Sequence, residues 1–156
     1  MNDSQTPDQK LVALGLTLPP LPTSGGNYLP AKRVGTTIYL SGVISSGADG
    51  VITGAAGAGR TVEEGYSAAL ACALIQLAVL RQELGSLNRV AEVLTVNGYV
   101  NAAPGFPDSP AIVNGASDLL VQVFGDTGRH VRAAVGVSAL PRNALVEIQM
   151  TVRVKD

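Results

Sequence analysis

Apolar residues recur at helical spacing between residues 62 and 84, which predicts one long helix with an apolar face. Thr61 precedes this segment and Glu64 follows three residues later, the capping-box pattern that satisfies free N–H groups of a first helical turn. Gly85 supplies the left-handed residue with which many helices end. We therefore expect a buried helix over residues 62–84.

A second helix is predicted to begin with Ser109 as its N-cap and Pro110 as its first residue, and to end at Gly125. Its apolar stripe is formed by Leu119, Leu120, Val123 and Phe124. The preceding residues 102–108 contain two prolines and a glycine, so they are expected to form a loop. The two helices are expected to pack beside each other.

The remaining periodic segments have the alternation or the β-branched composition of strands. They are residues 27–33, 36–41, 90–100, 131–138 and 146–154. The first two are expected to form a hairpin. The last two are expected to pair antiparallel through a turn at residues 140–144, which would place Arg132 and Glu147 on the same face. The small residues Ala134 and Gly136 would then leave a hollow beside the two charged groups.

The N-terminal residues have a different character from the rest of the chain. Prolines at 19, 20 and 22 and the glycines after them interrupt regular structure, apart from a short helical turn at residues 11–14. We expect an irregular segment over residues 1–26 and a single domain over residues 27–156. The chain is 46% hydrophobic and only 15% charged, which favours an oligomer because an interface would cover the excess apolar surface.

Charge and hydropathy limit the partners and the location. A net charge of -1 gives no electrostatic basis for binding nucleic acid, so a nucleic-acid partner is not expected. Residues 1–9 lack the apolar run of a secretory signal. The longest apolar stretch, residues 66–80, is too short to cross a bilayer. We expect a cytoplasmic protein that has no membrane partner.

Most conventional catalytic motifs are missing from the sequence. Cys72 is the only cysteine and His130 the only histidine, so one chain can form neither an internal disulfide nor a Cys/His zinc cluster, and no metal is expected. Cys72 lies in an apolar run, which favours inert packing, and His130 is interpreted as a strand-edge residue. Residues 54–61 have phosphate-loop spacing, but Arg60 replaces the lysine, which favours a flexible glycine loop.

Arg132 and Glu147 remain as candidates for chemistry. A guanidinium on a strand of small residues suits bidentate binding of a carboxylate, although an ordinary surface or interface arginine has the same pattern. Glu147 could accept a proton from water, or it could neutralise Arg132 or Arg153. The pattern alone leaves these alternatives open.

Residues 28–43, 99–114 and 129–154 together resemble the YjgF/RidA (reactive intermediate deaminase) family, also called endoribonuclease L-PSP-like. The most specific part is the C-terminal signature, in which Arg132 is followed by Leu140, Pro141 and then Glu147 between Val146 and Ile148. Residues in further cleft positions of the family pattern are Tyr28, Ser41, Gly42 and Asn114.

This resemblance implies an α+β, chorismate-mutase-like fold with a mixed sheet, two helices on one face, and a homotrimeric barrel with clefts between subunits. It implies hydrolysis of reactive enamine/imine intermediates such as 2-aminoacrylate to 2-keto acids and ammonia, without a cofactor. Arg132 would bind the substrate carboxylate, and Glu147 would orient or deprotonate water. The pocket would be shaped by Tyr28, Ser41, Gly42, Asn114 and Ala134.

The sequence departs from the family pattern at two positions beside the arginine. The family often has cysteine where this chain has Ala134, and often glutamate where it has Gly136. The loop at residues 101–110 and the long N-terminal segment indicate a divergent, longer branch, in which Phe106 is placed to reshape the cleft mouth or to face solvent. The alternative function is therefore a protein that binds small carboxylates without chemistry. Ribonuclease or translation-inhibitor activity ranks third.

Overall fold

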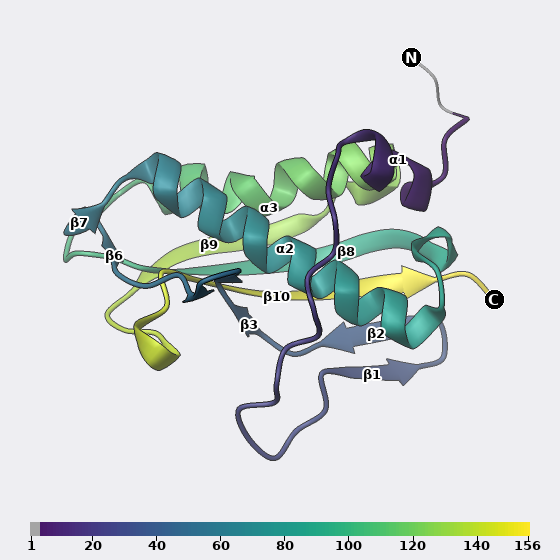
Figure 1. Cartoon of the computed structure of the whole chain (residues 1–156), viewed down its shortest axis with the longest axis horizontal. Helices are drawn as coiled ribbons and strands as arrows, with labels where there is room; N and C mark the ends of the chain where they lie inside the picture. Colours follow the sequence, from purple (N-terminus) through teal and green to yellow (C-terminus); the bar gives the residue numbers. More distant parts are fainter. Residues whose placement is uncertain (1–3) are drawn as a thin grey trace.

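The computed structural model describes residues 4–156 as an α+β arrangement of one mixed sheet and the helices that cover it (Figure 1). The helices are α1 (Pro7–Ala13), α2 (Val62–Leu84) and α3 (Ser109–Phe124). The strands of the main sheet are β1 (Ala31–Val34), β2 (Thr37–Leu40), β3 (Val43–Ile44), β8 (Val90–Asn101), β9 (Val131–Val137) and β10 (Val146–Val154). Short 3-10 turns are η1 (Leu87–Arg89), η2 (Gly125–Gly128) and η3 (Pro141–Asn143).

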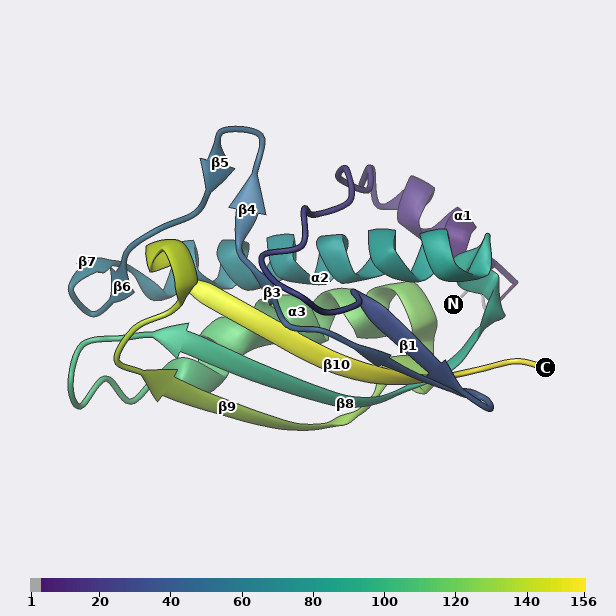
Figure 2. The same ribbon diagram turned by 90° about the horizontal axis from the view of Figure 1, so that it is seen from below.

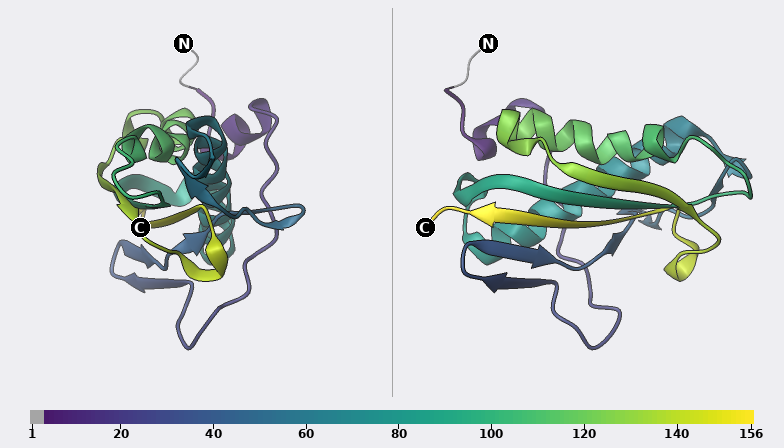
Figure 3. Two further views of the ribbon diagram at one scale, coloured as in Figure 1. Left: turned by 90° about the vertical axis from the view of Figure 1, so that its left-hand side faces the viewer. Right: turned by 180° about the vertical axis from the view of Figure 1, so that it is seen from behind.

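The main sheet has the strand order β1-β2-β10-β8-β9, and β3 also pairs with β10. β8 and β9 run parallel, whereas the other neighbours are antiparallel, so the sheet is mixed as expected. Helices α2 and α3 lie side by side on one face of this sheet (Figures 1 and 2). The opposite face carries no helix in the described part of the chain (Figure 3).

The predicted pairing of the last two strands is wrong. β9 and β10 do not pair with each other, because β8 lies between them and bonds to both. The chain leaves β8, crosses through α3 and returns parallel to β8 as β9, and it then passes across the end of β8 to form β10. Alternation along each strand is equally compatible with either neighbour, which is why the pattern could not exclude a direct hairpin.

The expected helices and the N-terminal hairpin are confirmed, with one correction. α2 has the predicted capping box of Thr61 and Glu64, and Gly85 ends it with φ 82°. β1 and β2 pair antiparallel. The N-cap of α3 is Asp108, and Ser109 is instead the first helical residue. Ser109 is buried, and its hydroxyl has no hydrogen-bond partner among residues 4–156.

The N-terminal segment is more regular than its sequence predicted. α1 has a capping box between Thr6 and Gln9, and Leu11 and Leu18 belong to the core, so ordered structure begins well before residue 27. Asp8 anchors α1 because its carboxylate accepts hydrogen bonds from the Ser86 hydroxyl at 2.5 Å and the Leu87 amide at 3.4 Å. The chain then crosses over α2 on its way to β1 (Figure 1).

The glycine-rich residues 54–61 contain two short strands, β6 (Ala55–Ala56) and β7 (Gly59–Arg60), where the sequence predicted only a loop. The Ala103 amide donates to the carbonyl of Ala56 at 2.9 Å, which ties this segment to the loop before α3. A two-stranded hairpin, β4 (Ser46–Gly47) with β5 (Gly50–Val51), follows β3. Phosphate binding, which the sequence already disfavoured, is opposed further because the Glu64 carboxylate occupies the α2 N-terminus and bonds Arg60 at 2.6 Å.

Helix α2 is the core helix of the domain. Its 23 residues are long and apolar enough to cross a bilayer by length and composition, a property that the apolar stretch at residues 66–80 alone did not reveal. However, 61% of its most apolar window is buried inside the protein. The apolar face is therefore explained by packing on the sheet and on α3, with Leu77 and Leu80 fully buried.

The close approach of α2 and α3 depends on glycine. A Cβ atom at Gly115 would overlap the carbonyl oxygen of Tyr66, whereas a Cβ at Gly65 would meet only the side chain of Ile112, nearest atom 2.6 Å. The obstacle at Gly115 is backbone, which moves only if the helices separate, whereas the obstacle at Gly65 is the buried side chain of Ile112, which must shift within its packing. Gly115 therefore permits the close approach of the two helix backbones, whereas Gly65 makes room for the side chain of Ile112.

We expect Gly115→Ala to lower the free energy of unfolding by about 3 kcal/mol, because the helices must separate. Gly65→Ala is the matched control, and its gain in helix propensity of about 1 kcal/mol should largely offset the rearrangement of Ile112. Urea unfolding followed by circular dichroism would measure both. Equal losses in the two variants would show that the contact at Gly115 does not set the helix separation.

Candidate functional site

Arg132 lies on β9, and α3 holds its guanidinium. Nη1 donates to the Asn114 side-chain oxygen at 2.8 Å and to the Ser117 hydroxyl at 3.0 Å, and Nη2 donates to the Pro110 carbonyl at 3.1 Å. These acceptors are neutral, and no carboxylate among residues 4–156 forms an ion pair with Arg132. Because a guanidinium has five N–H groups, the one on Nε and one on Nη2 remain for a ligand, enough for a bidentate carboxylate.

Glu147 lies on β10, between β3 and β8, where its neighbours across the ladders are Ile44 and Tyr99. The side chain is half-buried, and within residues 4–156 its carboxylate has neither a hydrogen-bond donor nor an ion-pair partner. Burial raises the pKa of Glu147 above its ordinary value. A half-buried carboxylate without a partner is costly for folding, which makes Glu147 a candidate for chemistry rather than structure.

A β-bulge places Ser41 and Gly42 next to Glu147. Between the pairs that β2 and β3 form with β10, the chain has three residues, 40–42, against the two residues 149 and 150, so one residue is extra. The Gln76 amide fills the gap by donating to the carbonyls of Ser41 and Ile148, both at 2.9 Å. A Cβ at Gly42 would lie 2.9 Å from the Glu147 carboxylate, so glycine lets that side chain keep its position.

Tyr28 lies close to Ser41 along the same surface segment but is not directed at Glu147. The Ser41 hydroxyl donates to the Leu29 carbonyl at 2.6 Å, which anchors this part of the chain. The Tyr28 hydroxyl accepts from the Gly25 amide at 3.3 Å, and half of the side chain is exposed. Tyr28 is therefore folded over its own loop in the single chain.

The structure divides the predicted site residues into two clusters. Asn114 and Ala134 accompany Arg132, whereas Ser41 and Gly42 accompany Glu147. We call these clusters the arginine half-site and the glutamate half-site. The first depends on contacts between β9 and α3, and the second on the bulge beside β10.

The prediction that Arg132 and Glu147 share a face is wrong. Arg132 pairs with Val96 of β8, and Glu147 pairs with Tyr99 of the same strand. Paired residues point to the same face, and positions 96 and 99 are three positions apart, an odd step, along a strand that has a period of two. Arg132 therefore lies on the helix-covered face and Glu147 on the open face, so one chain cannot bring them together.

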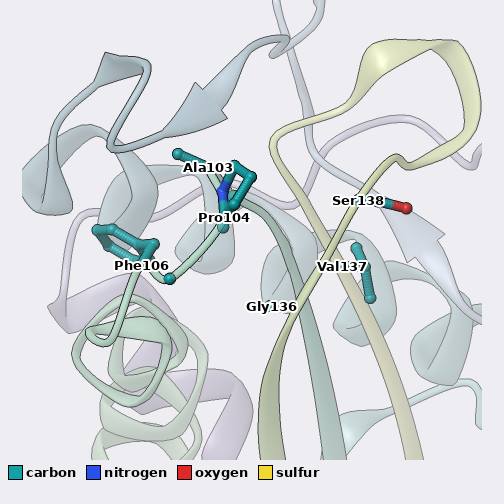
Figure 4. A pocket seen from close by; sticks show the side chains of 8 residues that line it. Ala103, Pro104, Phe106, Gly136, Val137 and Ser138 are labelled. Carbon is teal, nitrogen blue, oxygen red and sulfur yellow. The ribbon is translucent and has the colours of Figure 1, made fainter.

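A surface cavity of about 450 Å³ lies beside the C-terminal end of β9 (Figure 4). One wall is the loop of residues 102–106, and the other is residues 136–138. Gly136 has no side chain to fill it, and a Cβ there would lie 3.6 Å from the buried hydroxyl of Ser109. Phe106 is half-buried and packs on the core while lining this cavity, rather than facing solvent.

The remaining candidate side chains have clear environments. Cys72 is fully buried, and burial, with the nearby Glu147 charge, raises the pKa of its thiol far above the ordinary range, as expected for inert packing. No three His, Cys, Asp or Glu side chains gather as potential metal ligands in residues 4–156. His130 directly precedes β9, in agreement with its interpretation as a strand-edge residue, and its Nε2 lies 2.8 Å from the Ser117 hydroxyl.

Sequence reasoning missed Ser117 altogether. It lies one helical turn from Asn114 and on the same side of α3, so both can reach Arg132. Because Asn114 was already a candidate, its spacing from Ser117 on a predicted helix could have identified Ser117 from the sequence. The contact between Ser117 and His130 could not be predicted from the sequence, because it depends on how the chain leaves η2 and enters β9.

These features define a class of protein: an α+β domain with two helices on one face of a mixed sheet, whose charged half-sites face in opposite directions. The family model described as "YjgF/chorismate mutase-like, putative endoribonuclease" matches residues 8–153. The chain belongs to this family, the YjgF/RidA family, and has its chorismate-mutase-like fold.

Individual relatives cover nearly the whole chain. Protein TCP17 of Trypanosoma cruzi is 40% identical over 148 residues, which are 94% of this chain and 92% of that protein. A 2-iminobutanoate/2-iminopropanoate deaminase of Dermatophagoides farinae is 30% identical over 137 residues, 88% of this chain and 93% of that protein. The structure is similar to that of Atu1372, a protein of unknown function from Agrobacterium tumefaciens, with TM-score 0.87, 36% identity, and coverage of 96% and 94% of the two chains.

The ionised form of Glu147 should make the folded protein less stable than the protonated form does. Because burial raises its folded-state pKa, the protonated form is favoured in the fold, and this favourable contribution is lost as pH rises through that pKa. We expect Glu147→Gln to unfold at a higher temperature than wild type at neutral pH, with the difference shrinking toward about pH 4, where glutamate protonates even when unfolded.

Scanning calorimetry between pH 4 and neutrality would measure this difference. Glu63→Gln is the matched control, since Glu63 is exposed in the first turn of α2 and should show no comparable gain. A Glu147→Gln variant that unfolds at a lower temperature than wild type throughout would mean that the carboxylate has a stabilising partner.

Proposed function

We propose that this protein hydrolyses reactive enamine/imine intermediates of the 2-aminoacrylate type to 2-keto acids and ammonia. The observation that carries the proposal is the state of Arg132, whose guanidinium is held by neutral acceptors and keeps two N–H groups for a carboxylate. Family membership and the similarity to a 2-iminobutanoate/2-iminopropanoate deaminase support it. Neither a metal nor a cofactor is part of the proposal.

The working protein is proposed to be a homotrimer whose sites form between copies. The open face of the sheet carries exposed apolar side chains, among them Tyr39 at 53% and Val131 at 71% exposure, which favours a covering partner. Since Arg132 and Glu147 face opposite sides of one sheet, the arginine half-site of one copy would meet the glutamate half-site of the next. A closed ring allows every copy to contribute both.

The reaction requires positioning and two proton transfers through Glu147. Arg132 would bind the carboxylate and so place the imine carbon beside a water held by Glu147. The water oxygen bonds to the imine carbon while the Glu147 carboxylate takes a water proton. The C=N π electrons move to the nitrogen, which receives this proton, and a carbinolamine forms. Its hydroxyl proton then passes through Glu147 to the nitrogen as the C=O bond forms and the C–N bond breaks, so ammonia and a 2-keto acid leave. A glutamate whose pKa is raised by burial suits both the uptake and the return of the proton.

Release of ammonia and keto acid from enzymatically generated 2-aminoacrylate tests the activity directly. We expect wild type to exceed buffer, and Arg132→Ala to lose between about tenfold and about a hundredfold in kcat/KM, as for removal of a charged hydrogen-bonding group. Arg33→Ala is the matched control, because Arg33 is exposed and bonds only the nearby Gly35 carbonyl. Full activity in Arg132→Ala would refute the assigned role.

A mixing experiment tests the shared site. Arg132→Ala and Glu147→Ala chains should each keep only a small fraction of wild-type activity alone, yet a trimer assembled from both can pair an intact Arg132 with an intact Glu147 of the neighbour. Random assembly from equal amounts should restore about a quarter of the sites, because each site draws its two halves from different copies.

The control for mixing is the double variant Arg132→Ala/Glu147→Ala combined with either single variant, which cannot complete any site. The activity of the mixture would be compared before and after unfolding and joint refolding. A jointly refolded mixture no more active than its components would contradict the proposal that the half-sites come from different copies.

A second candidate function is binding of a small carboxylate without chemistry. The cavity beside Gly136 and the absence of a side-chain thiol or carboxylate at positions 134 and 136 favour it. The same assay separates the two functions. Thermal stabilisation by a keto acid, lost in Arg132→Ala, without release of ammonia above buffer would favour the binding function. Ribonuclease activity gains no support from the net charge of -1.

A further inference from the structure

A chain of hydrogen bonds leads from Arg132 through Ser117 to His130. Arg132 Nη1 lies 3.0 Å from the Ser117 hydroxyl, which lies 2.8 Å from His130 Nε2. At the other side of the ring, His130 Nδ1 lies 2.7 Å from the carbonyl oxygen of Gly128. The serine and the histidine are both half-buried. The chain therefore connects the edge of β9 with α3 and with the end of η2.

The direction of each hydrogen bond follows from the chemistry of its atoms. A carbonyl oxygen only accepts, so His130 Nδ1 must carry a hydrogen. In the neutral ring Nε2 is then an acceptor, and the Ser117 hydroxyl donates to it. The lone pairs of that hydroxyl are left for Arg132, which can only donate. A neutral His130 in the Nδ1–H form thus fixes the Ser117 hydroxyl in the orientation that accepts from the guanidinium.

We propose that Ser117 and His130 are positioning residues that fix the guanidinium of Arg132 for carboxylate capture. The proposal rests on the function proposed for Arg132. Nη1 is held by Asn114 and Ser117 together, while Nη2 is held by Pro110, so the guanidinium plane has supports at both nitrogens. His130 touches no ligand in this scheme and acts only through Ser117.

If Ser117 interacted only with its own helix, its hydroxyl would make a different hydrogen bond. A serine inside a helix commonly bonds the carbonyl four residues earlier, but the Ser117 hydroxyl is directed to the His130 ring instead. We call the hydrogen-bond chain from Arg132 through Ser117 to His130 the relay. Because its serine and histidine are neutral, it adds no charge near Arg132, and the guanidinium keeps its full positive charge for an anion. An acidic partner in place of the serine would hold the arginine as firmly but would neutralise it.

The single histidine of the chain makes the relay observable. Nitrogen-15 NMR of the histidine ring distinguishes protonated from unprotonated ring nitrogens, and His130 alone contributes. At about pH 8, we expect wild type to show the Nδ1–H form, because Nδ1 faces the Gly128 carbonyl. Ser117→Ala should release the ring into a mixture of both forms. A dominant Nε2–H form in wild type, or spectra unchanged in Ser117→Ala, would overturn the relay.

Binding of 2-oxobutanoate, measured by calorimetry, tests the positioning role. We expect Ser117→Ala and His130→Ala each to weaken binding by about fivefold, as for one neutral hydrogen bond. His130→Gln should restore most of the affinity, since its amide can accept from Ser117 and donate to Gly128. Ser67→Ala, at an exposed position of α2, is the matched control and should bind like wild type.

In the deaminase assay, the Ser117 and His130 variants should raise KM and leave kcat within about twofold, because the chemical step does not involve them. If Arg132→Ala abolishes binding while Ser117→Ala and His130→Ala bind like wild type, the relay is refuted and the proposed function stands. If Arg132→Ala binds like wild type, the proposed function fails, and the positioning role fails with it.

Discussion

Strand β8 pairs with β10 along one edge and with β9 along the other, and the registers of these two ladders determine where the charged groups lie. One ladder aligns Arg132 with Val96, and the other aligns Glu147 with Tyr99. A change of one residue in either register would exchange the faces of every side chain on that strand. The separation of the half-sites is thus a consequence of backbone pairing, which is fixed by the buried apolar residues of the helix-covered face.

The arginine half-site further requires that α3 lie close to both α2 and the sheet. Glycine makes this possible at two contacts, because a Cβ at Gly115 would overlap the α2 backbone and a Cβ at Gly98 would overlap Val113 of α3. With α3 held there, Asn114 and Ser117 reach across to Arg132. On α3, the residues at these close contacts, Val113 and Gly115, therefore lie next to Asn114 and Ser117, which hold the guanidinium.

Local signals predicted local structure well, and they failed where structure depends on distant neighbours. Thr61, Glu64 and Gly85 fixed the ends of α2, since caps act within a single turn. Alternation identified β9 and β10 but not the strand between them, because it indicates faces and not partners. The candidate residues could be named from their resemblance to a family, whereas their division into two half-sites, and the contact between Ser117 and His130, required the tertiary structure.

The two half-sites have complementary electrostatic needs. Arg132 keeps a positive charge that no described carboxylate neutralises, and Glu147 has a half-buried carboxylate that no described group stabilises. A 2-imino acid carries a carboxylate at one end and, when protonated, a cationic nitrogen one carbon away. In the proposed shared site the first charge would lie on Arg132 and the second would face Glu147, so one small molecule would satisfy both groups. A simple carboxylate would satisfy only the arginine, which is why the imino acid, rather than its keto-acid product, is the better complement to the assembled site.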